Sequence, residues 1–569
     1  MGAFALVIGG HKKREQVARD ALSKRGFSVN DRLAVGSNIL LLAPSLVAPE
    51  PNLIRRGADF AAASGTLFYK GLYGERALAA LLDEDRPPAR DDISGCGVFL
   101  VARGGVLRLF TDPLGTYKVY RDTADTIWSD SFLAVAQTLT APAINPQGVY
   151  EYVFQGATYG NETVLDRVQL VDSKSIHEIG DRVHSTPWPG GIEPAINQAP
   201  LEHHVDTLTE LLRERYGAIA TAFGDRVDTA LSGGYDSRLT LALLLDQGVT
   251  PHLHVYGAPD DPDVIVARTV CAGEGLSISH EDKSALGDDS PDGVTAAVKQ
   301  QFLAFDGWPP DGIIGNGSDL ATRRARCHNG VLALNGGGGE IFRNFFYLID
   351  RPFTVRQILW TFYSRFEPRW CGEAFDESAY YTRMGEKISA IFTRPRDRLT
   401  RAEVEYIYPA FRGRFWTGRN TAINTHLGPA LTPFLDHALV RAAVGVPLAY
   451  KNHGILEAAM IEAISPALAR YASDYGHSFC GAVPLRRKLR DWMTYVRPPA
   501  LRRFSYRFKT RLQPPGLKRF LQPNYRRSYL PNGIAYMDRF FHLDRVTDPA
   551  QMNRILTLEF LFQDLNARF

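Results

Sequence analysis

Short apolar runs separated by glycine-rich turns dominate the first 190 residues, and this pattern predicts strands. The predicted strands are Phe4–Ile8, Ile39–Ala43, Gly97–Ala102, Val106–Phe110 and Tyr117–Tyr120. Gly104-Gly105 is a predicted hairpin turn, and Asp112–Gly115 is a turn before the last strand. We therefore expect residues 1–190 to form a strand-rich unit.

The pattern changes after residues 187–200, which contain four prolines and two adjacent glycines and are typical of a linker. Strands and helices alternate beyond it: a helix over 201–222, a strand Val227–Leu231, a helix through Leu245, a strand Pro251–Tyr256, a helix Val264–Glu274 and a strand Val331–Leu334. This alternation predicts an α/β fold, a doubly wound domain around a parallel sheet, over residues 200–569. From about residue 350 onward the pattern predicts mainly helices.

Composition narrows the classes of protein that the chain can represent. Of 569 residues, 45% are hydrophobic and 22% charged, which excludes a mainly disordered chain, a collagen-like fibre and a coiled coil. The net charge of +3 gives no global reason to expect a nucleic-acid partner. Five scattered cysteines without a Cys-x-x-Cys pair argue against a zinc or dithiol site and indicate a reducing cytoplasm. No run approaches the roughly 20 apolar residues of a membrane span.

The strongest local signal is the segment Leu231-Ser232-Gly233-Gly234-Tyr235-Asp236-Ser237, where a buried strand turns through glycines into a helix. Such a turn presents backbone N–H groups and the positive end of a helix to phosphates. Ser232 and Ser237 add hydroxyl donors. Asp236 would repel a phosphate directly, so its expected role is to hold Mg²⁺ against pyrophosphate oxygens. The alternative is an ordinary strand–helix turn with an Asp cap.

This segment resembles the phosphate loop of the ATP-pyrophosphatase (PP-loop) synthetases, and nearly the whole chain resembles the asparagine synthetase family. The further matching motifs are Asp112-Pro113-Leu114-Gly115, Trp128-Ser129-Asp130-Ser131, Pro433-Phe434-Leu435-Asp436 and the glycine run that ends in Glu340-Ile341-Phe342. The resemblance implies a glutaminase-like α+β domain of the Ntn type over residues 1–190. It implies an ATP-dependent ligase domain over residues 200–569.

One departure from the family narrows the reaction. Glutamine-dependent members use an N-terminal cysteine as nucleophile, and this chain has Gly2 there. The resemblance then favours the branch of lasso peptide macrolactam cyclases, on Asp236–Leu239, Tyr475–Phe479 and Pro484–Arg487. A small-molecule amide ligase of the asparagine or β-lactam synthetase type, and a non-catalytic peptide-binding scaffold, remain alternatives.

The family pattern also assigns residues to roles. Its second acidic metal ligand falls on Gly339, which leaves Glu340 as the candidate second Mg²⁺ ligand beside Asp236, or as a cap or ion-pair residue. A cation for the leaving pyrophosphate falls on Lys451 or His453. The predicted ATP contacts are Leu231, Ser232, Gly233, Gly234, Asp236, Ser237, Tyr256, Gly257 and Gly337.

A basic segment follows the ligase motifs. Residues 485–527 hold fourteen Arg or Lys and one acid, Asp491, with aromatic residues between them. Three interpretations are open: nucleic-acid binding, a docking surface for an acidic leader peptide or partner protein, or solvated helix faces with aromatic side chains in the core. The resemblance implies a precursor peptide as substrate, with a leader peptidase and a leader-recognition protein as partners. It implies neither nucleic acid nor a membrane.

Overall fold

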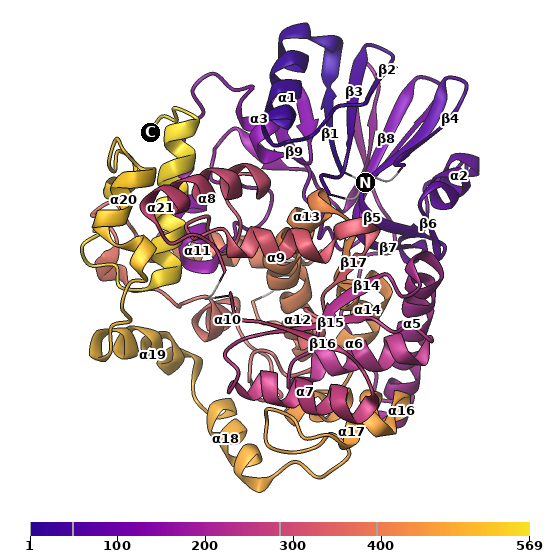
Figure 1. The fold of residues 1–569 in the computed structure, drawn as a ribbon, viewed down its shortest axis with the longest axis vertical. Coiled ribbons are helices and arrows are strands. Elements are labelled where there is room, and N and C mark those ends of the chain that lie inside the picture. Colours follow the sequence, from indigo (N-terminus) through magenta and orange to yellow (C-terminus); the bar gives the residue numbers. More distant parts are fainter. Residues whose placement is uncertain (1, 48–50, 284–285, 394–396) are drawn as a thin grey trace.

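The computed structural model describes residues 2–47, 51–283, 286–393 and 397–569 (Figure 1). Two antiparallel sheets form the first part of the chain. One has the strand order β11-β9-β10-β1-β3-β2 and the other β13-β12-β8-β7-β5-β4, with β6 added on β5. Their bounds are β1 Gly2–Val7, β2 Asp31–Val35, β3 Asn38–Pro44, β4 Leu53–Arg56, β5 Asp59–Tyr69, β6 Leu72–Tyr73, β7 Ile93–Arg103, β8 Val106–Thr111, β9 Tyr120–Asp122, β10 Ile127–Ser129, β11 Val168–Leu170, β12 Ser175–Ile179 and β13 Val183–Pro187.

Four of the five strands predicted in this part are confirmed. The fifth, predicted over Tyr117–Tyr120, begins only at Tyr120. The reason lies in the preceding turn, where the Asp112 carboxylate accepts the backbone N–H groups of Thr116 and Tyr117, each at 2.8 Å. Those N–H groups are therefore not available to a neighbouring strand.

The two sheets pack face to face between helices. Phe4, Leu6 and Leu42 of the first sheet share a buried cluster with Val98 and Leu100 of the second. Helix α1 (Lys12–Lys24) covers the outer face of the first sheet, and α2 (Glu75–Asp83) packs on the outer face of the second. The layers therefore run helix, sheet, sheet, helix, and Figure 1 shows them at the top of the molecule.

A five-stranded parallel sheet forms the second part, in the order β16-β15-β14-β17-β18, as the α/β alternation predicted. The strand bounds are β14 Val227–Ala230, β15 His252–Tyr256, β16 Ile278–Glu281, β17 Leu332–Leu334 and β18 Ala430–Leu431. The accompanying helices are α5 Leu201–Phe223, α6 Tyr235–Asp246, α7 Pro262–Glu274, α8 Pro291–Ala304 and α9 Ser318–Arg326. The chain adds strands on one side of β14 and then on the other. The end of β14 is therefore a switch point, where open sheets of this kind bind ligands.

The remaining chain is mainly helical, as predicted. Its helices are α10 Val355–Phe362, α11 Glu377–Ser389, α12 Arg401–Ile407, the π-helix η7 Tyr408–Thr417, α13 Gly418–Leu427, α14 His437–Val444, α15 Leu448–Lys451, α16 Ile455–Ile464, α17 Pro466–Arg470, α18 Leu485–Tyr495, α19 Pro499–Leu512, α20 Pro523–Tyr529 and α21 Pro549–Asp564. In the first part, α3 spans Phe132–Ala136 and α4 spans Pro146–Gln155. In the described part of the chain, no helix combines the length and the apolar character that crossing a bilayer needs.

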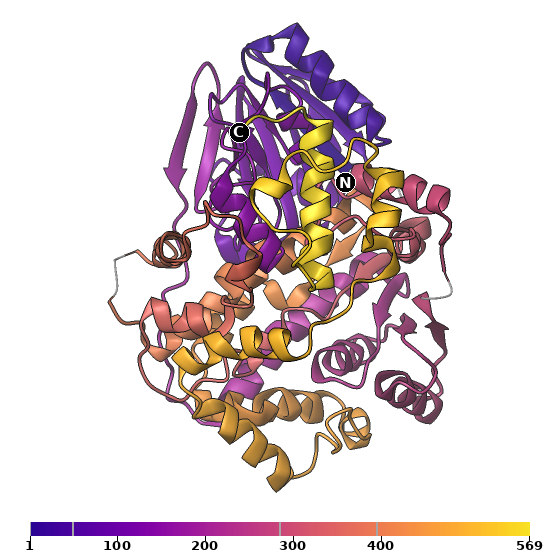
Figure 2. The same cartoon turned by 90° about the vertical axis from the view of Figure 1, so that its left-hand side faces the viewer.

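The two parts are in contact along the chain's last helix. The side chain of Arg554 on α21 donates through Nη1 to the carbonyl of Val153 on α4, at 3.1 Å. Phe154 of α4 stacks on Phe366, with the ring centroids 4.2 Å apart. Figure 2 shows α21, in yellow, in front of the antiparallel sheets. The predicted linker, residues 187–200, overlaps β13 at Pro187, and the rest of it contains no helix or strand.

Candidate functional site

The glycine-rich segment forms a strand–turn–helix unit, as predicted. Strand β14 ends at Ala230, and α6 begins at Tyr235, with Gly234 as its N-cap. Within the turn, Ser237 Oγ accepts the Ser232 N–H at 3.0 Å and lies 2.9 Å from Ser232 Oγ. The two hydroxyl groups predicted to bind phosphate are therefore side by side at the helix N-terminus.

A neighbouring segment packs over this turn. Tyr235 stacks on Phe479, with centroids 4.1 Å apart, and Arg238 donates to the carbonyl of Tyr471 at 2.7 Å. The Gly233 N–H donates to Asp263 Oδ1 at 2.8 Å. One of the turn's donors is thus engaged by a carboxylate, and an anionic ligand would have to replace that carboxylate to use it.

The second glycine loop meets the first at the carboxyl edge of the parallel sheet. It follows β17, and a Cβ built on Gly339 would lie 2.3 Å from Asp236 Oδ1 and 3.2 Å from Glu457 Oε1. A Cβ on Gly336 would lie 3.1 Å from the Asp236 carbonyl oxygen. No side chain fits at residue 339 in this arrangement, because Asp236 occupies the space.

A cation lies among these carboxylates. Arg343 donates through Nη2 to Asp236 Oδ1 and Oδ2, at 2.8 Å each, and its Nε is 3.3 Å from Glu457 Oε2. Burial works to lower the pKa of Arg343, but the charges of Asp236, Glu457 and Glu340 outweigh it and raise that pKa well above its ordinary value. The site thus carries a fixed positive charge.

Glu457 is the second carboxylate of the site. It lies on α16 and is fully buried, and among the described residues neither of its oxygens has a hydrogen-bond partner. Burial, and then the charge of Asp236, raise its pKa well above the ordinary value. A buried carboxylate without a hydrogen-bond donor is costly, and the ion pair with Arg343 offsets only part of that cost.

These donors fit Mg²⁺, which binds oxygen ligands and usually takes one or two carboxylates together with substrate phosphates. The described residues contain no group of three or more acidic, His or Cys side chains arranged to hold a metal without a substrate. Asp236 and Glu457 would supply the protein oxygens, and Arg343 would have to release Asp236.

Glu340 lies in the same loop but has different partners. Its Oε2 accepts the hydroxyl of Tyr408 at 2.5 Å and the Gly338 N–H at 3.2 Å. It also lines a cavity of about 370 Å³ together with Arg343, Phe362 and Arg502. Its carboxylate is therefore placed at the wall of a cavity that adjoins the Asp236 site.

The structure places the two candidate cations in other contacts. Lys451 is buried, and its Nζ is 2.9 Å from Glu405 Oε2. Burial lowers its pKa, although Glu405 opposes this. His453 Nδ1 is 2.7 Å from Asp491 Oδ2, and the His453 carbonyl accepts the Tyr235 hydroxyl at 3.3 Å. Lys451 could serve a phosphate only by leaving Glu405, whereas His453 already lies beside the helix that carries Asp236.

The other predicted ATP contacts follow neighbouring strands. Tyr256 ends β15, which pairs with β14, and its ring faces Lys283 Nζ at 4.1 Å. Gly257 follows it and accepts His280 Nε2 at 2.8 Å. Gly337 donates its N–H to Asn335 Oδ1 at 2.8 Å. All three lie at the same edge of the sheet as Asp236.

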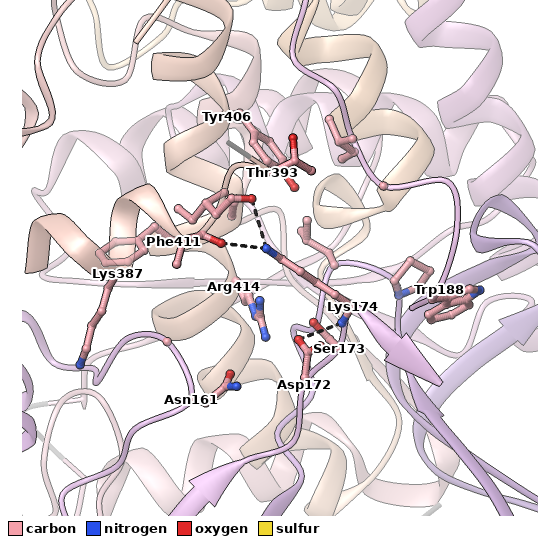
Figure 3. Close-up of a pocket in the computed structure, with 18 of the residues that line it drawn as sticks. Asn161, Asp172, Ser173, Lys174, Trp188, Lys387, Thr393, Tyr406, Phe411 and Arg414 are labelled. Atoms are coloured by element: carbon pink, nitrogen blue, oxygen red, sulfur yellow. Dashed lines mark hydrogen bonds between the residues drawn. The ribbon is translucent and has the colours of Figure 1, made fainter. Parts of the chain in front are cut away.

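A larger cavity, of about 820 Å³, contains none of the predicted site residues. Its walls come from residues 160–174 and 187–193 on one side and from α11 and η7 on the other (Figure 3). Lys174 Nζ crosses it to donate to the carbonyls of Ala390 and Ile391, at 2.9 and 3.2 Å. It is separate from the site around Asp236.

Position 2 has no room for a nucleophile. Gly2 begins β1 and pairs with Pro44, and a Cβ built on it would lie 2.0 Å from the Ala43 carbonyl oxygen. The atoms in this contact belong to the backbone of β3, so a side chain at residue 2 would force β1 and β3 apart.

Three residues of the site were not predicted from the sequence: Arg343, Tyr408 and Glu457. For Glu457 a signal existed, because it is an acidic residue in the first turn of a helix, Ile455–Ile464, whose only other charged residue is Glu462. Arg343 follows directly on the Glu340-Ile341-Phe342 motif. Tyr408 carried no signal of its own.

Comparison with known proteins gives little beyond this geometry. No protein-family model and no curated protein matches the chain. A solved glutamine phosphoribosylpyrophosphate amidotransferase from B. subtilis, complexed with ADP and GMP, is similar at 11% identity and a TM-score of 0.23 over 50% of this chain and 66% of its own. A solved allosteric regulatory enzyme of purine biosynthesis is similar at 12% identity and a TM-score of 0.23 over 44% of this chain and 65% of its own. The matches span just under two thirds of those chains and carry no argument about activity.

Proposed function

We propose that this protein is an ATP-dependent amide ligase that closes a macrolactam ring on a peptide, as lasso peptide cyclases do. The observation that carries the proposal is the meeting of the Ser232–Ser237 turn with the Gly339 loop at the switch point of a parallel sheet. There, hydroxyl and backbone donors for phosphates lie next to the carboxylates of Asp236 and Glu457 and next to a cavity.

The residue at position 2 bears on the roles that we assign to the two parts of the chain. We assign residues 1–190 to a glutaminase-like domain without a nucleophile and residues 200–569 to the ligase domain. The helix–sheet–sheet–helix layers and the closed contact at Gly2 support this assignment. The attacking amine must then come from the substrate rather than from glutamine.

In the reaction, the donors of the turn and the N-terminus of α6 bind the phosphates of ATP. Bound Mg²⁺ would neutralise charge that develops on the phosphates, held by Asp236 and Glu457. A carboxylate of the peptide attacks the α-phosphorus, the bond to pyrophosphate breaks, and an acyl-adenylate forms. Arg343 stabilises the negative charge of this step.

The second step closes the ring. The peptide's own amine forms a bond to the acyl carbon, and the bond from that carbon to the oxygen of AMP breaks. The carboxylate of Glu340, at the cavity wall, takes the proton that the amine loses. Holding both ends of one peptide in the cavity raises their effective concentration, which lowers the entropic part of the barrier.

The test is incubation with ATP, Mg²⁺ and a leader-free precursor peptide. We expect AMP and pyrophosphate as products, and a peptide that has lost one water and resists N-terminal sequencing. Acetylation of the peptide's N-terminus should stop ring closure but leave ATP–pyrophosphate exchange. Incorporation of added ammonium into an open chain would contradict the cyclase and support a small-molecule type of amide ligase.

A pair of variants tests the role assigned to Asp236. Asp236→Asn should keep the fold and lose activity by several orders of magnitude, because Mg²⁺ contributes several kcal/mol at the phosphates. Asp260→Asn, an exposed change outside the site, should have no effect. Exchange that is absent in the unaltered protein with every peptide would indicate a non-catalytic scaffold.

A further inference from the structure

Helices α18 and α19 turn their apolar side chains to solvent. On α18 and its C-cap these are Leu485, Leu489, Trp492, Met493 and Val496, and on α19 Leu501, Phe504, Phe508 and Leu512; their exposed fractions run from 45% for Val496 to 82% for Leu485. The spacings of three and four residues place each set on one helix face. The aromatic residues Trp492, Phe504 and Phe508 are therefore not in the core, which was one interpretation of the basic segment.

The polar side of α19 faces the protein. Arg502 is buried and donates to the carbonyls of Phe346 and Tyr347 at 2.7 and 2.6 Å. Arg507 is buried against Glu377, and Arg511 Nε is 2.7 Å from Glu367 Oε2. This is the reverse of an ordinary surface helix, whose apolar stripe packs on the core.

Helix α18 is attached in the same way. Asp491 is buried and pairs with His453, and Arg487 stacks over the ring of Tyr475 at 4.2 Å. Both helices are thus held by polar contacts and leave their apolar faces free. Figure 2 shows them on the side of the molecule turned to the viewer. Exposed apolar rows of this kind mark an interaction site.

The charge around the apolar faces of α18 and α19 indicates which kind of partner would fit them. The exposed charged residues of this segment are all basic: Arg486, Lys488, Arg490, Arg497, Lys509, Arg511, Lys518, Arg519 and Arg527. Its one acid, Asp491, is buried. A complementary surface is therefore apolar and rimmed with acidic groups.

The position of the helices favours a polypeptide over a lipid surface. The cavity that contains Glu340 and Arg343 is also lined by Thr494 and Arg497 from the α18 end and by Arg502 of α19. A chain docked on these helices has its continuation beside the cavity. Binding to a bilayer would not require the two helices to lie next to this cavity.

We propose that the outward faces of α18 and α19 bind a polypeptide segment with an apolar stripe flanked by Asp and Glu, and thereby deliver substrate to the cavity. The choice of a polypeptide rests on the proposed function, since the cavity is assigned there to a peptide. The contact itself follows from the exposed apolar rows and the basic rim. Arg502, Arg503 and Arg507 contact the protein itself and are not part of this surface.

The probe is a fluorescent synthetic helix with Leu and Phe on one face and Glu on its flanks. We expect it to bind the full-length protein, and to bind at least ten-fold more weakly after Trp492→Ser, Phe504→Ser and Phe508→Ser are combined. Ile265→Ser, on α7 and equally exposed at 53%, is the matched control and should not change binding. A peptide with Lys in place of Glu should fail to bind, and added salt should weaken the Glu peptide.

Other outcomes would overturn the proposal. Binding that the triple change leaves intact would place the contact elsewhere. Retention on vesicles of phosphatidylcholine and phosphatidylglycerol without binding of the Glu peptide would assign the face to a lipid surface. A dimer in solution that the triple change converts to a monomer would assign it to a second copy. The binding assay contains no ATP, so failure of ATP–pyrophosphate exchange would contradict the ligase and leave this result standing.

Discussion

Arg343 holds both carboxylate oxygens of Asp236 through a single nitrogen, Nη2. The guanidinium occupies the place at Asp236 that Mg²⁺ would take. The two cations would therefore compete for one carboxylate.

This competition can be measured. Arg343→Met leaves Asp236 and Glu457 without their cation and should lower the free energy of unfolding by about 3–5 kcal/mol. Mg²⁺ should restore part of that loss, because it can take the vacated place, so the melting temperature of the variant should rise with MgCl₂ at constant ionic strength. Arg324→Met, at an exposed position on α9, should show neither effect. A variant that is insensitive to Mg²⁺ would contradict the assignment of the metal to these carboxylates.

The raised pKa of Glu457 predicts that the stability of the protein depends on pH. Its pKa in the folded protein is raised well above the ordinary 4.5 by burial and by Asp236. The stability from this group is therefore fully present below pH 4.5 and is lost as pH rises through the folded pKa. Urea unfolding should show Glu457→Gln gaining stability relative to the unaltered protein as pH rises from 4.5 toward 8. The exposed Glu373→Gln should give a difference that does not vary with pH.

A Lys451 variant can show whether this lysine serves an ion pair with Glu405 or binds a phosphate. Because Lys451 and Glu405 are both buried at 2.9 Å, Lys451→Met should cost stability at the lower end of about 3–5 kcal/mol, since Glu405 keeps Arg401. Combining it with Glu405→Leu should recover most of that loss in denaturant unfolding. A variant that unfolds normally yet loses pyrophosphate exchange would restore the phosphate role.

Gly2 can be tested by adding the side chain that the resemblance expects. Gly2→Cys should lower the free energy of unfolding by about 1–3 kcal/mol, because its Cβ would overlap the backbone of β3. It should not produce glutamate from glutamine. Gly191→Cys, which has open space around its Cβ, is the control and should be near neutral. Glutaminase activity in Gly2→Cys would show that the strands can move apart.

The parts of the fold that depend on local pattern could be predicted. The turn at Ser232–Ser237 is one example, because a strand, two glycines and a helix start follow one another in sequence. The contact between Asp236 and Glu457 could not be predicted, because α16 lies far along the chain and only its packing on α6 brings the two residues together. The direction of α19 could not be either, since its spacing defines an apolar face but not whether that face turns inward.

The last residues of the chain contact its first part, and this contact bears on the cooperativity of unfolding. Ile144 donates its backbone N–H to the Arg568 carbonyl at 2.9 Å, and Arg568 donates to the carbonyl of Pro142 at 2.9 Å. These contacts join the last residues to the segment before α4. A cut within residues 188–200 would therefore yield two fragments that each expose surface the other now covers. We expect the intact chain to melt in one transition, and neither fragment to remain folded when it is produced alone.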